Sequence, residues 1–134
     1  MSVEFEDILY EVRNTVAWIT INRPEKMNSF RGQTCDEIIK ALNKAGYDRN
    51  VGAIVLAGAG DRAFCTGGDQ SAHNGNYDGR GTIGLPVEEL HTAIRDVGLP
   101  FFAWTRRRAP RASARAGLPH RMFPVGHARF GLIA

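Results

Sequence analysis

The stretch Ala53-Ile-Val-Leu-Ala-Gly-Ala-Gly-Asp-Arg-Ala-Phe-Cys-Thr-Gly-Gly-Asp-Gln70 decides the fold of this 134-residue chain. Its first five residues are all apolar, which indicates a strand that is covered on both faces of its sheet. Glycines follow at once, and a glycine-rich segment can bring backbone N–H groups close to a ligand because no Cβ stands in the way. We therefore expect an anion or oxyanion site just past this strand, around Gly67 and Gly68.

Two further strands are predicted near the N-terminus. Residues Ile8–Val12 and Val16–Ile21 are rich in β-branched and aromatic side chains. The polar residues Arg13-Asn-Thr15 separate these runs. The pattern predicts a β-hairpin.

A helix is predicted between this hairpin and the buried strand. Thr34 and Glu37 have the spacing of a capping box, and Gly46 is suited to end the helix. The apolar residues of its stripe are Ile38, Ile39, Leu42 and Ala45. A strand, a helix and a second strand form a βαβ unit of an α/β fold, and such sheets bind ligands at the carboxyl ends of their strands.

Another helix is predicted after a long glycine-rich segment. Pro86 fits a first helical turn, Glu88 and Glu89 lie near the positive end, and apolar residues recur on one stripe up to Val97. Residues 71–85, which precede this helix, are polar and rich in glycine. A loop that covers a substrate and a plain surface loop are both open interpretations of them.

Length and composition limit the class of protein. A chain of 134 residues suffices for one small domain or part of a larger one. The acidic start, Met1-Ser-Val-Glu-Phe-Glu-Asp7, lacks the basic and apolar regions of a signal peptide, and no apolar run has membrane-spanning length, so we expect a cytoplasmic protein. Cys35 and Cys65 lack metal-ligand spacing, so we expect two buried thiols and no metal site.

The net charge of +3 hides a sharp division of the chain. Residues 1–100 hold 10 Lys and Arg and all 14 Asp and Glu, a balance of −4, so residues 101–134 carry the remaining +7. All seven of these charges are arginines. The change predicts a boundary between a partial core, residues 1–104, and an arginine-rich tail, residues 105–134, that is irregular and not natively structured.

Two segments resemble the crotonase, or enoyl-CoA hydratase/isomerase, superfamily: Ile19-Thr-Ile-Asn-Arg-Pro-Glu-Lys-Met-Asn28 and Ala63-Phe-Cys-Thr-Gly-Gly-Asp-Gln70. The resemblance covers about residues 3–100. It implies the N-terminal part of a spiral core of ββα repeats, an acyl-CoA substrate and a family assembly of trimers or hexamers. It also implies that no cofactor is needed beyond the coenzyme A that the substrate carries.

Within the family, three segments most resemble the 2-ketocyclohexanecarboxyl-CoA hydrolases, which open a ring in anaerobic aromatic-acid degradation. These segments are Gly67-Gly-Asp-Gln70, Asn76-Tyr-Asp-Gly-Arg80 and Glu89-Leu-His-Thr-Ala-Ile-Arg95. The implied reaction is hydrolytic cleavage at a β-keto group through a thioester enolate. Dihydroxynaphthoyl-CoA synthase and enoyl-CoA hydratase are the alternatives.

The resemblance also implies the site residues. Gly68 has the position of the first of two backbone N–H groups that hold the thioester oxygen, and Lys26 matches a position that often meets the CoA phosphates. Met27 replaces a residue that is basic in the naphthoate-forming relatives. The positions that line the acyl pocket in the relatives are occupied by Thr66, Gly67, Asp69, Gln70 and Tyr77. A capping role for Asp69 and a plain surface role for Lys26 are open alternatives.

After Pro100 the chain departs from the family pattern. The segment Phe101-Phe-Ala-Trp104 is suited to the strand expected there, but no run of three glycines follows to supply the second amide. Family-like sequence returns at Ala128-Arg-Phe-Gly131. We hypothesise that the reading frame is lost near codon 105 and recovered near codon 127, because glycine codons of GC-rich DNA become arginine or alanine codons when read out of frame.

This reading predicts a truncated chain of weak stability, with half an oxyanion hole and no turnover. Two other classes stay open. An arginine-rich module could neutralise nucleic-acid phosphates, although no stacking platform accompanies the arginines. A noncatalytic remnant would keep acyl-CoA binding without the chemistry.

Overall fold

The computed structural model describes residues 5–60, 64–65, 87–106 and 120–124. The elements are β1 (Ile8–Arg13), β2 (Val16–Ile21), the 3-10 helix η1 (Pro24–Lys26), α1 (Gly32–Tyr47), β3 (Ala53–Gly58), α2 (Val87–Asp96), β4 (Phe101–Arg106) and β5 (His120–Pro124). The strands form one sheet in the order β1-β2-β3-β4-β5. β2, β3 and β4 run parallel, and the two outer strands run antiparallel to their neighbours. The α/β class and the βαβ unit of β2, α1 and β3 are confirmed.

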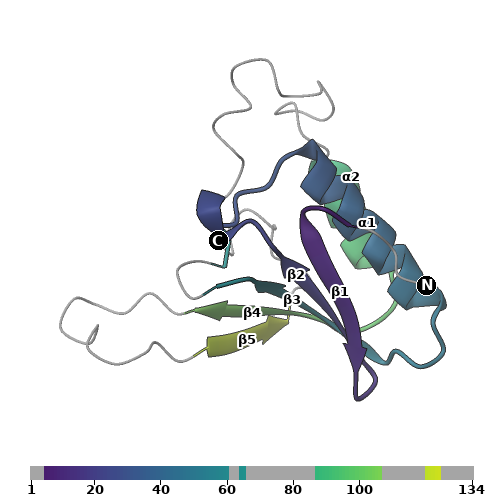
Figure 1. Ribbon diagram of the computed structural model, residues 1–134. Helices are drawn as coiled ribbons and strands as arrows, with labels where there is room; N and C mark the ends of the chain where they lie inside the picture. Colours follow the sequence, from purple (N-terminus) through teal and green to yellow (C-terminus); the bar gives the residue numbers. More distant parts are fainter. Residues whose placement is uncertain (1–4, 61–63, 66–86, 107–119, 125–134) are drawn as a thin grey trace.

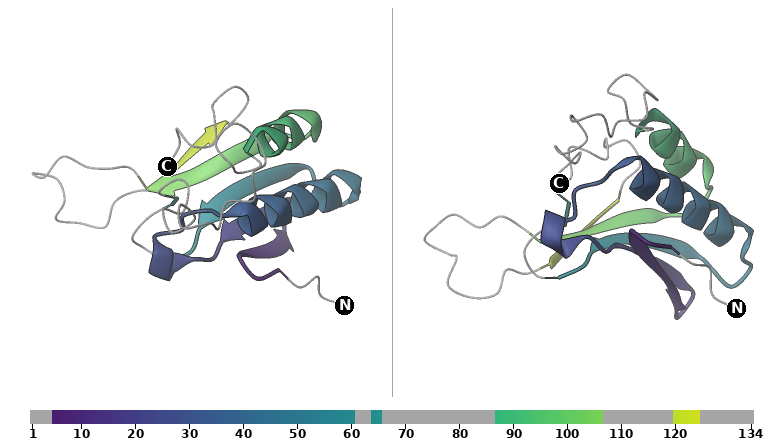
Figure 2. Two further views of the ribbon diagram at one scale, coloured as in Figure 1. Left: turned by 90° about the horizontal axis from the view of Figure 1, so that it is seen from above. Right: turned by 45° about the horizontal axis from the view of Figure 1, so that its top comes forward.

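Both helices lie on one side of the sheet, where α1 packs against β1, β2 and α2 (Figures 1 and 2). Alternate residues of β2 are fully buried in the core between the layers: Ala17, Ile19 and Ile21. The helices contribute Ile38, Ala41, Leu42, Ala45, Leu90 and Ile94 to the same core. Each fully buried Ile or Leu side chain stabilises the fold by about 1.5–3 kcal/mol relative to an exposed one.

The N-terminal hairpin is confirmed, with a tighter turn than the sequence predicts. Arg13 pairs with Val16, so only Asn14 and Thr15 connect the strands. Their φ angles are 51° and 66°, a left-handed pair whose twist suits a two-residue hairpin. Asparagine adopts this conformation readily, whereas the β-branched Thr15 is strained in it.

The ends of α1 differ from the predicted ones. The helix begins at Gly32, and the hydroxyl of Thr34 accepts a hydrogen bond from the backbone N–H of Arg31 at 3.1 Å. Glu37 makes no capping box with Thr34, because its carboxylate accepts the N–H of Asp7 at 2.8 Å instead. Gly46 does not end the helix, which continues to Tyr47, and a Cβ added at Gly46 would lie 3.3 Å from Cγ2 of Val97, the residue after α2.

The tail also departs from the predicted irregular structure. β4 continues to Arg106, and β5 pairs with it in antiparallel register from Arg106↔His120 to Phe102↔Pro124. Without β5, the outer edge of β4 would present unpaired backbone N–H and C=O groups. A strand of any side-chain composition can pair with these groups, because the hydrogen bonds involve only the backbone. The division of the chain at residue 105 stays a prediction.

The sheet face opposite the helices carries aromatic side chains. Trp18 of β2 and Trp104 of β4 lie edge to face with ring centroids 5.5 Å apart. The guanidinium of Arg13 lies 4.8 Å from the centroid of the Trp18 ring, a cation–π arrangement. Cys35 and Cys65 are both buried, as predicted, and they form no disulfide bond.

Candidate functional site

The parallel strands β2, β3 and β4 end at one edge of the sheet, which we call the carboxyl edge. Of the connections that leave the sheet there, two carry the family motifs: the β2 turn, residues 23–29, and the glycine loop, residues 58–70, of which 58–60 and 64–65 are described. Figure 1 shows η1, which belongs to the β2 turn, at the end of the sheet toward which β4 points. Ligands of open α/β sheets bind outside this edge, so it is the place to look for a site.

The β2 turn is a compact backbone structure. The N–H groups of Lys26 and Asn28 both donate to the carbonyl oxygen of Arg23, at 2.9 and 2.8 Å. Met27 and Asn28 have φ angles of 55° and 57°, so the chain passes through two successive left-handed residues. This conformation leaves the Lys26 side chain exposed and Met27 half-buried.

Asn28 connects the β2 turn to the glycine loop. Its Oδ1 accepts the backbone N–H of Arg23 at 2.9 Å, and its Nδ2 donates to the carbonyl oxygen of Ala59 at 2.9 Å. Ala59 in turn donates its N–H to Ile21 at the end of β2, at 2.8 Å. The first peptide groups of the glycine loop are therefore held against β2 and its turn.

A second close approach fixes the other described part of the glycine loop. A Cβ added at Gly58 would overlap the carbonyl oxygen of Phe64 and lie 2.8 Å from its Cα. Phe64 and Cys65 are both buried in the core, with 7% and 2% of their surface exposed. Glycine is required at position 58 because the returning chain occupies the space of a side chain.

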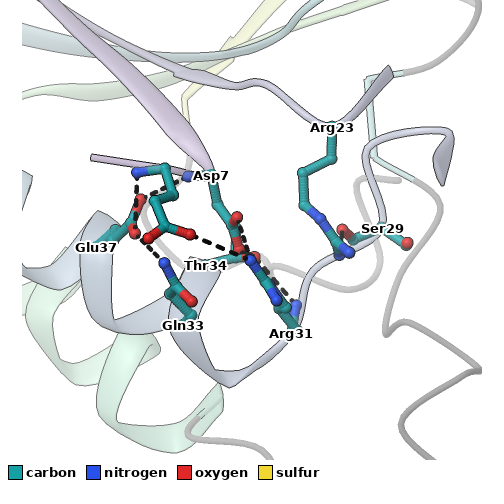
Figure 3. Close-up of polar contacts among 8 residues, drawn as sticks. Asp7, Arg23, Ser29, Arg31, Gln33, Thr34 and Glu37 are labelled. Atoms are coloured by element: carbon teal, nitrogen blue, oxygen red, sulfur yellow. Dashed lines mark hydrogen bonds and ion pairs between the residues drawn. The ribbon is translucent and has the colours of Figure 1, made fainter. Parts of the chain in front are cut away.

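A polar network holds the segment between the β2 turn and α1 (Figure 3). The guanidinium of Arg31 donates from Nε and Nη2 to the two carboxylate oxygens of Asp7, both at 2.8 Å. Thr34 donates its hydroxyl to Asp7 Oδ2 at 2.6 Å. Arg23 donates from Nη1 to the carbonyl oxygen of Ser29 at 2.6 Å.

Buried polar and charged residues are concentrated in this region of the described chain. Within residues 5–60, 64–65, 87–104, the buried polar or charged residues are Asp7, Arg23, Asn28, Ser29, Thr34 and Glu37. All of them lie in the β2 turn, in the segment that follows it, or against its polar network. Buried polar groups cost free energy unless they are paired, so such a concentration indicates a geometry that the fold maintains.

The network sets the charge states of its members. Burial by itself raises the pKa of Asp7, but hydrogen bonds from Arg31 and Thr34 and the positive charges of Arg31 and Arg23 outweigh it, so the pKa lies below its ordinary value. The hydrogen bond to Asp7 raises the pKa of Arg31 against the effect of its own burial. Asp7 and Arg31 are thus both ionised at neutral pH, and their ion pair fixes the segment between the β2 turn and α1.

Of the predicted site residues, Lys26 and Met27 lie in the β2 turn at the carboxyl edge. The others, Thr66, Gly67, Gly68, Asp69, Gln70 and Tyr77, lie outside the described residues. Asn28 and Gly58 were not predicted as site residues. Asn28 follows Arg23-Pro24 in the quoted family segment, and an asparagine in such a turn is a signal for left-handed backbone.

Two findings concern other kinds of site. Among the residues that the structure describes, no three His, Cys, Asp or Glu side chains are placed to hold a metal ion. No helix in that same part of the chain is long and apolar enough to cross a membrane.

Comparison with known proteins places this geometry in context. A family model described as enoyl-CoA hydratase/isomerase matches residues 11–110. A crystal structure of an enoyl-CoA hydratase/isomerase from Xanthobacter autotrophicus Py2 is 30% identical with a TM-score of 0.64, over 77% of this chain and 39% of that one. A Pseudomonas aeruginosa structure is 26% identical with a TM-score of 0.63, over 76% of this chain and 45% of that one.

An enoyl-CoA hydratase from Mycobacterium avium subsp. paratuberculosis K-10 shares the fold. It is 24% identical with a TM-score of 0.64, and the match covers 78% of this chain and 40% of that one. The chain therefore spans less than half the length of these solved structures.

Proposed function

The chain belongs to the enoyl-CoA hydratase/isomerase family, and from this membership we propose that its carboxyl edge binds an acyl-CoA thioester. The observation that carries the proposal is the contact between the β2 turn and the glycine loop through Asn28. Asn28 is the last residue of the first family segment, and Ala59 lies four residues before the start of the second one. Lys26 is the exposed cation on the β2 turn, and we assign it to the phosphates of CoA.

The glycine loop is proposed to bind the thioester end of the ligand. We assign the backbone N–H of Gly68 to the thioester carbonyl oxygen, which becomes negatively charged as an enolate forms. A fixed N–H directed at such an oxygen stabilises the transition state by about 3–4 kcal/mol. The acyl pocket in this proposal is lined by Thr66, Gly67, Asp69, Gln70 and Tyr77.

The reaction proposed for an intact relative of this chain is hydrolytic cleavage of 2-ketocyclohexanecarboxyl-CoA. Water adds to the ring ketone, and the bond between that carbon and the α-carbon breaks. The electron pair moves into the thioester as an enolate, and the α-carbon then takes up a proton. The product is an open chain with a free carboxyl group at one end and the CoA thioester at the other.

Hydration of an enoyl-CoA is the second candidate reaction. It is supported by the similarity to the enoyl-CoA hydratase/isomerase family, and it uses the same oxyanion contact. The two candidates differ in the acyl group. Tighter binding of 2-ketocyclohexanecarboxyl-CoA than of crotonyl-CoA would support ring cleavage, and the reverse order would support hydration.

Binding rather than turnover is the suitable test, because no triple glycine follows β4 to supply a second N–H. The experiment is calorimetric titration of the full chain with acetoacetyl-CoA, an unstrained β-keto thioester. We expect micromolar binding, a loss of at least about 10-fold for Gly68→Pro, which removes the N–H, and a smaller loss for Gly68→Ala, which keeps it. No heat of binding to the unsubstituted chain would overturn the proposal.

We also propose that residues 105–127 are an out-of-frame translation of the segment that supplies the second amide. The support is the arginine run Arg106–Arg108 where the family has glycines, and the return of family-like sequence at Ala128. Resequencing the DNA from codon 95 onward tests this directly. A corrected frame that reads Gly-Gly-Gly near position 110 is the expected result, and an unchanged frame would contradict it.

A further inference from the structure

β1 is an outer strand of the sheet, and no strand among residues 5–60, 64–65, 87–106 and 120–124 pairs with its outer edge (Figure 1). The strand pairs with β2 over its whole length and contains no proline. Of the three large hydrophobic residues that are exposed in this part of the chain, Leu9 and Val12 lie on β1, with 53% and 37% of their surface exposed. A regular, partly apolar edge of this kind is a template for pairing with another strand.

The pairing with β2 fixes which backbone groups of β1 face outward. In an antiparallel pair, every second residue exchanges backbone hydrogen bonds with the partner strand. The N–H of Asn22 donates to the carbonyl oxygen of Asp7 at 2.8 Å, and the two-residue turn makes Arg13 part of a hydrogen-bonded pair. The odd-numbered residues of β1 therefore bond to β2, so the N–H and C=O groups of Tyr10 and Val12 point to the outer edge.

Exposure limits the accessible edge to the second half of β1. Ile8, at the start of the strand, is 1% exposed, and the N–H of the preceding Asp7 donates to a carboxylate of α1. Glu11, Val12 and Arg13 are all exposed. A further strand would therefore lie along this second half, with Val12 at the centre of the contact.

Glu11 and Arg13 give this half of β1 a charge pattern that complements itself. They lie on one face of the strand, where Nε of Arg13 is 3.1 Å from Oε1 of Glu11, and 57% of the arginine and 61% of the glutamate side chain is exposed. If two copies of β1 run antiparallel with Val12 opposite Val12, Glu11 of each copy faces Arg13 of the other. Opposite charges at facing positions stabilise a strand pair. A register with Tyr10 opposite Val12 would instead place Glu11 opposite Glu11, so the charges select the first register.

We propose that the second half of β1 is an interaction surface for a second copy of this chain, which pairs with it antiparallel about a two-fold axis at Val12. The N–H and C=O groups of Val12 exchange hydrogen bonds with the same groups of the second copy, and the two Glu11–Arg13 ion pairs join into a network of four charges. Such pairing uses the same surface on both copies and closes at a dimer. The contact is small, so the dimer is weak and reversible.

This surface is separate from the candidate acyl-CoA site. Arg13 pairs with Val16 at the end of the sheet opposite the β2 turn. The inference therefore goes beyond the proposed function and does not depend on it.

The experiment is sedimentation equilibrium of the full chain over a range of concentrations at low ionic strength. We expect a reversible monomer–dimer equilibrium that salt weakens, because the four charges are exposed. Glu11→Arg and Arg13→Glu each place like charges opposite one another in the dimer. Each should raise the dissociation constant by about 10-fold or more.

Mixing the two variants tests the register. In a mixed dimer the positive charges of Glu11→Arg face the negative charges of Arg13→Glu, so an equimolar mixture should dimerise about as well as the unsubstituted chain. Glu89→Arg and Arg95→Glu are the matched controls, because they make the same changes of charge at exposed residues of α2. Both should dimerise like the unsubstituted chain, alone and mixed.

Val12→Pro tests the backbone contact. The N–H of Val12 faces the outer edge, so proline removes no hydrogen bond to β2. It removes the N–H at the centre of the dimer and should raise the dissociation constant by about 10-fold or more. Circular dichroism verifies that the variant keeps the fold.

Three results would overturn the inference. The first is an unsubstituted chain that stays monomeric at every concentration. The second is self-association that Glu11→Arg or a folded Val12→Pro leaves unchanged, and the third is a mixture of the two charge variants that associates no better than either alone. If Val12→Pro does not fold, the charge variants decide the question, because both replace side chains that are more than half exposed. None of these results bears on acyl-CoA binding, which the titration with acetoacetyl-CoA tests separately.

Discussion

Two turns of this chain use the same backbone conformation at the two ends of β2. The hairpin turn before β2 has Asn14 and Thr15 at φ 51° and 66°, and the β2 turn after it has Met27 and Asn28 at φ 55° and 57°. The first asparagine is exposed. The second is buried and reaches Ala59 in another segment.

This difference shows that side-chain contacts fix the backbone geometry more closely at the carboxyl edge than at the hairpin turn. Two successive left-handed residues are enough to reverse the chain direction in a hairpin. In the hairpin turn, Asn14 and Thr15 do this without a long-range side-chain hydrogen bond among the described residues. At the carboxyl edge the same conformation is combined with buried polar groups and a hydrogen bond to the start of the glycine loop. Burial and partners, rather than backbone conformation, therefore distinguish the candidate site from an ordinary turn.

The largest effect is expected from Gly58→Ala at the carboxyl edge. The new Cβ would overlap the Phe64 backbone, so β3 or the returning chain must move. The free energy of unfolding in urea should fall by about 3 kcal/mol. Gly52→Ala at the opposite edge is the control, because its Cβ would meet only Thr15 O at 3.9 Å. Equal effects of the two substitutions would contradict the close approach.

Truncating the two asparagines compares the turns directly. Asn28→Ala removes the partners of Arg23 N–H and of the Ala59 carbonyl, and should lower the free energy of unfolding by about 2–3 kcal/mol. Asn14→Ala at an exposed turn should cost no more than about 1 kcal/mol. Urea unfolding of both variants measures the difference. Similar losses would mean that the buried hydrogen bonds of Asn28 add nothing to the free energy of unfolding.

The Asp7 network should make the carboxyl edge sensitive to acid. Its lowered pKa means that the ionised form stabilises the fold, fully at pH above the ordinary value of 3.8, and that this contribution is lost as the pH falls through the folded pKa. Asp7→Asn should therefore cost about 2 kcal/mol at pH 7 and less near pH 3. Glu11→Gln, at an exposed ion pair with Arg13, should change little at either pH. Urea titrations at the two pH values test this, and a constant effect of Asp7→Asn would refute it.

The smallest effect is expected at the hairpin turn and has the opposite sign. Thr15→Gly relieves a β-branched residue from φ 66° and creates an Asn-Gly turn, so the free energy of unfolding should rise by about 0.5 kcal/mol. A shift of the thermal unfolding midpoint to higher temperature measures it. A decrease would show that Thr15 is held by contacts that offset its strain.

The sequence predicts the elements well where local patterns decide them. The apolar run from Ala53 and the β-branched and aromatic residues of Val16–Ile21 predict the two strands on either side of α1. The start of α1 is missed because Thr34 and Glu37 bond to residues outside the helix, and the end is missed by one residue, at a glycine that lies close to Val97. Such tertiary contacts leave no local signal. β5 is missed for the same reason, since its pairing partner lies in β4.

For the candidate site, the sequence predicts only residues that lie within or close to the family motifs. Lys26 and Met27 lie in the turn that follows β2, at the edge where the parallel strands end together, and their role in CoA binding stays a prediction. The connection through Asn28 could not be predicted, since it depends on the left-handed turn that directs this side chain toward Ala59. The assignments of Gly68 and its neighbours stay predictions.

The central claim is that an acyl-CoA thioester binds at the carboxyl edge and leaves the hairpin turn untouched. Hydrogen exchange of the full chain with and without acetoacetyl-CoA, read by mass spectrometry, measures this for peptides from each turn. We expect slower exchange in residues 22–31 and 58–70 and unchanged exchange in residues 9–17. Unchanged exchange everywhere, or equal slowing in the hairpin turn, would contradict it.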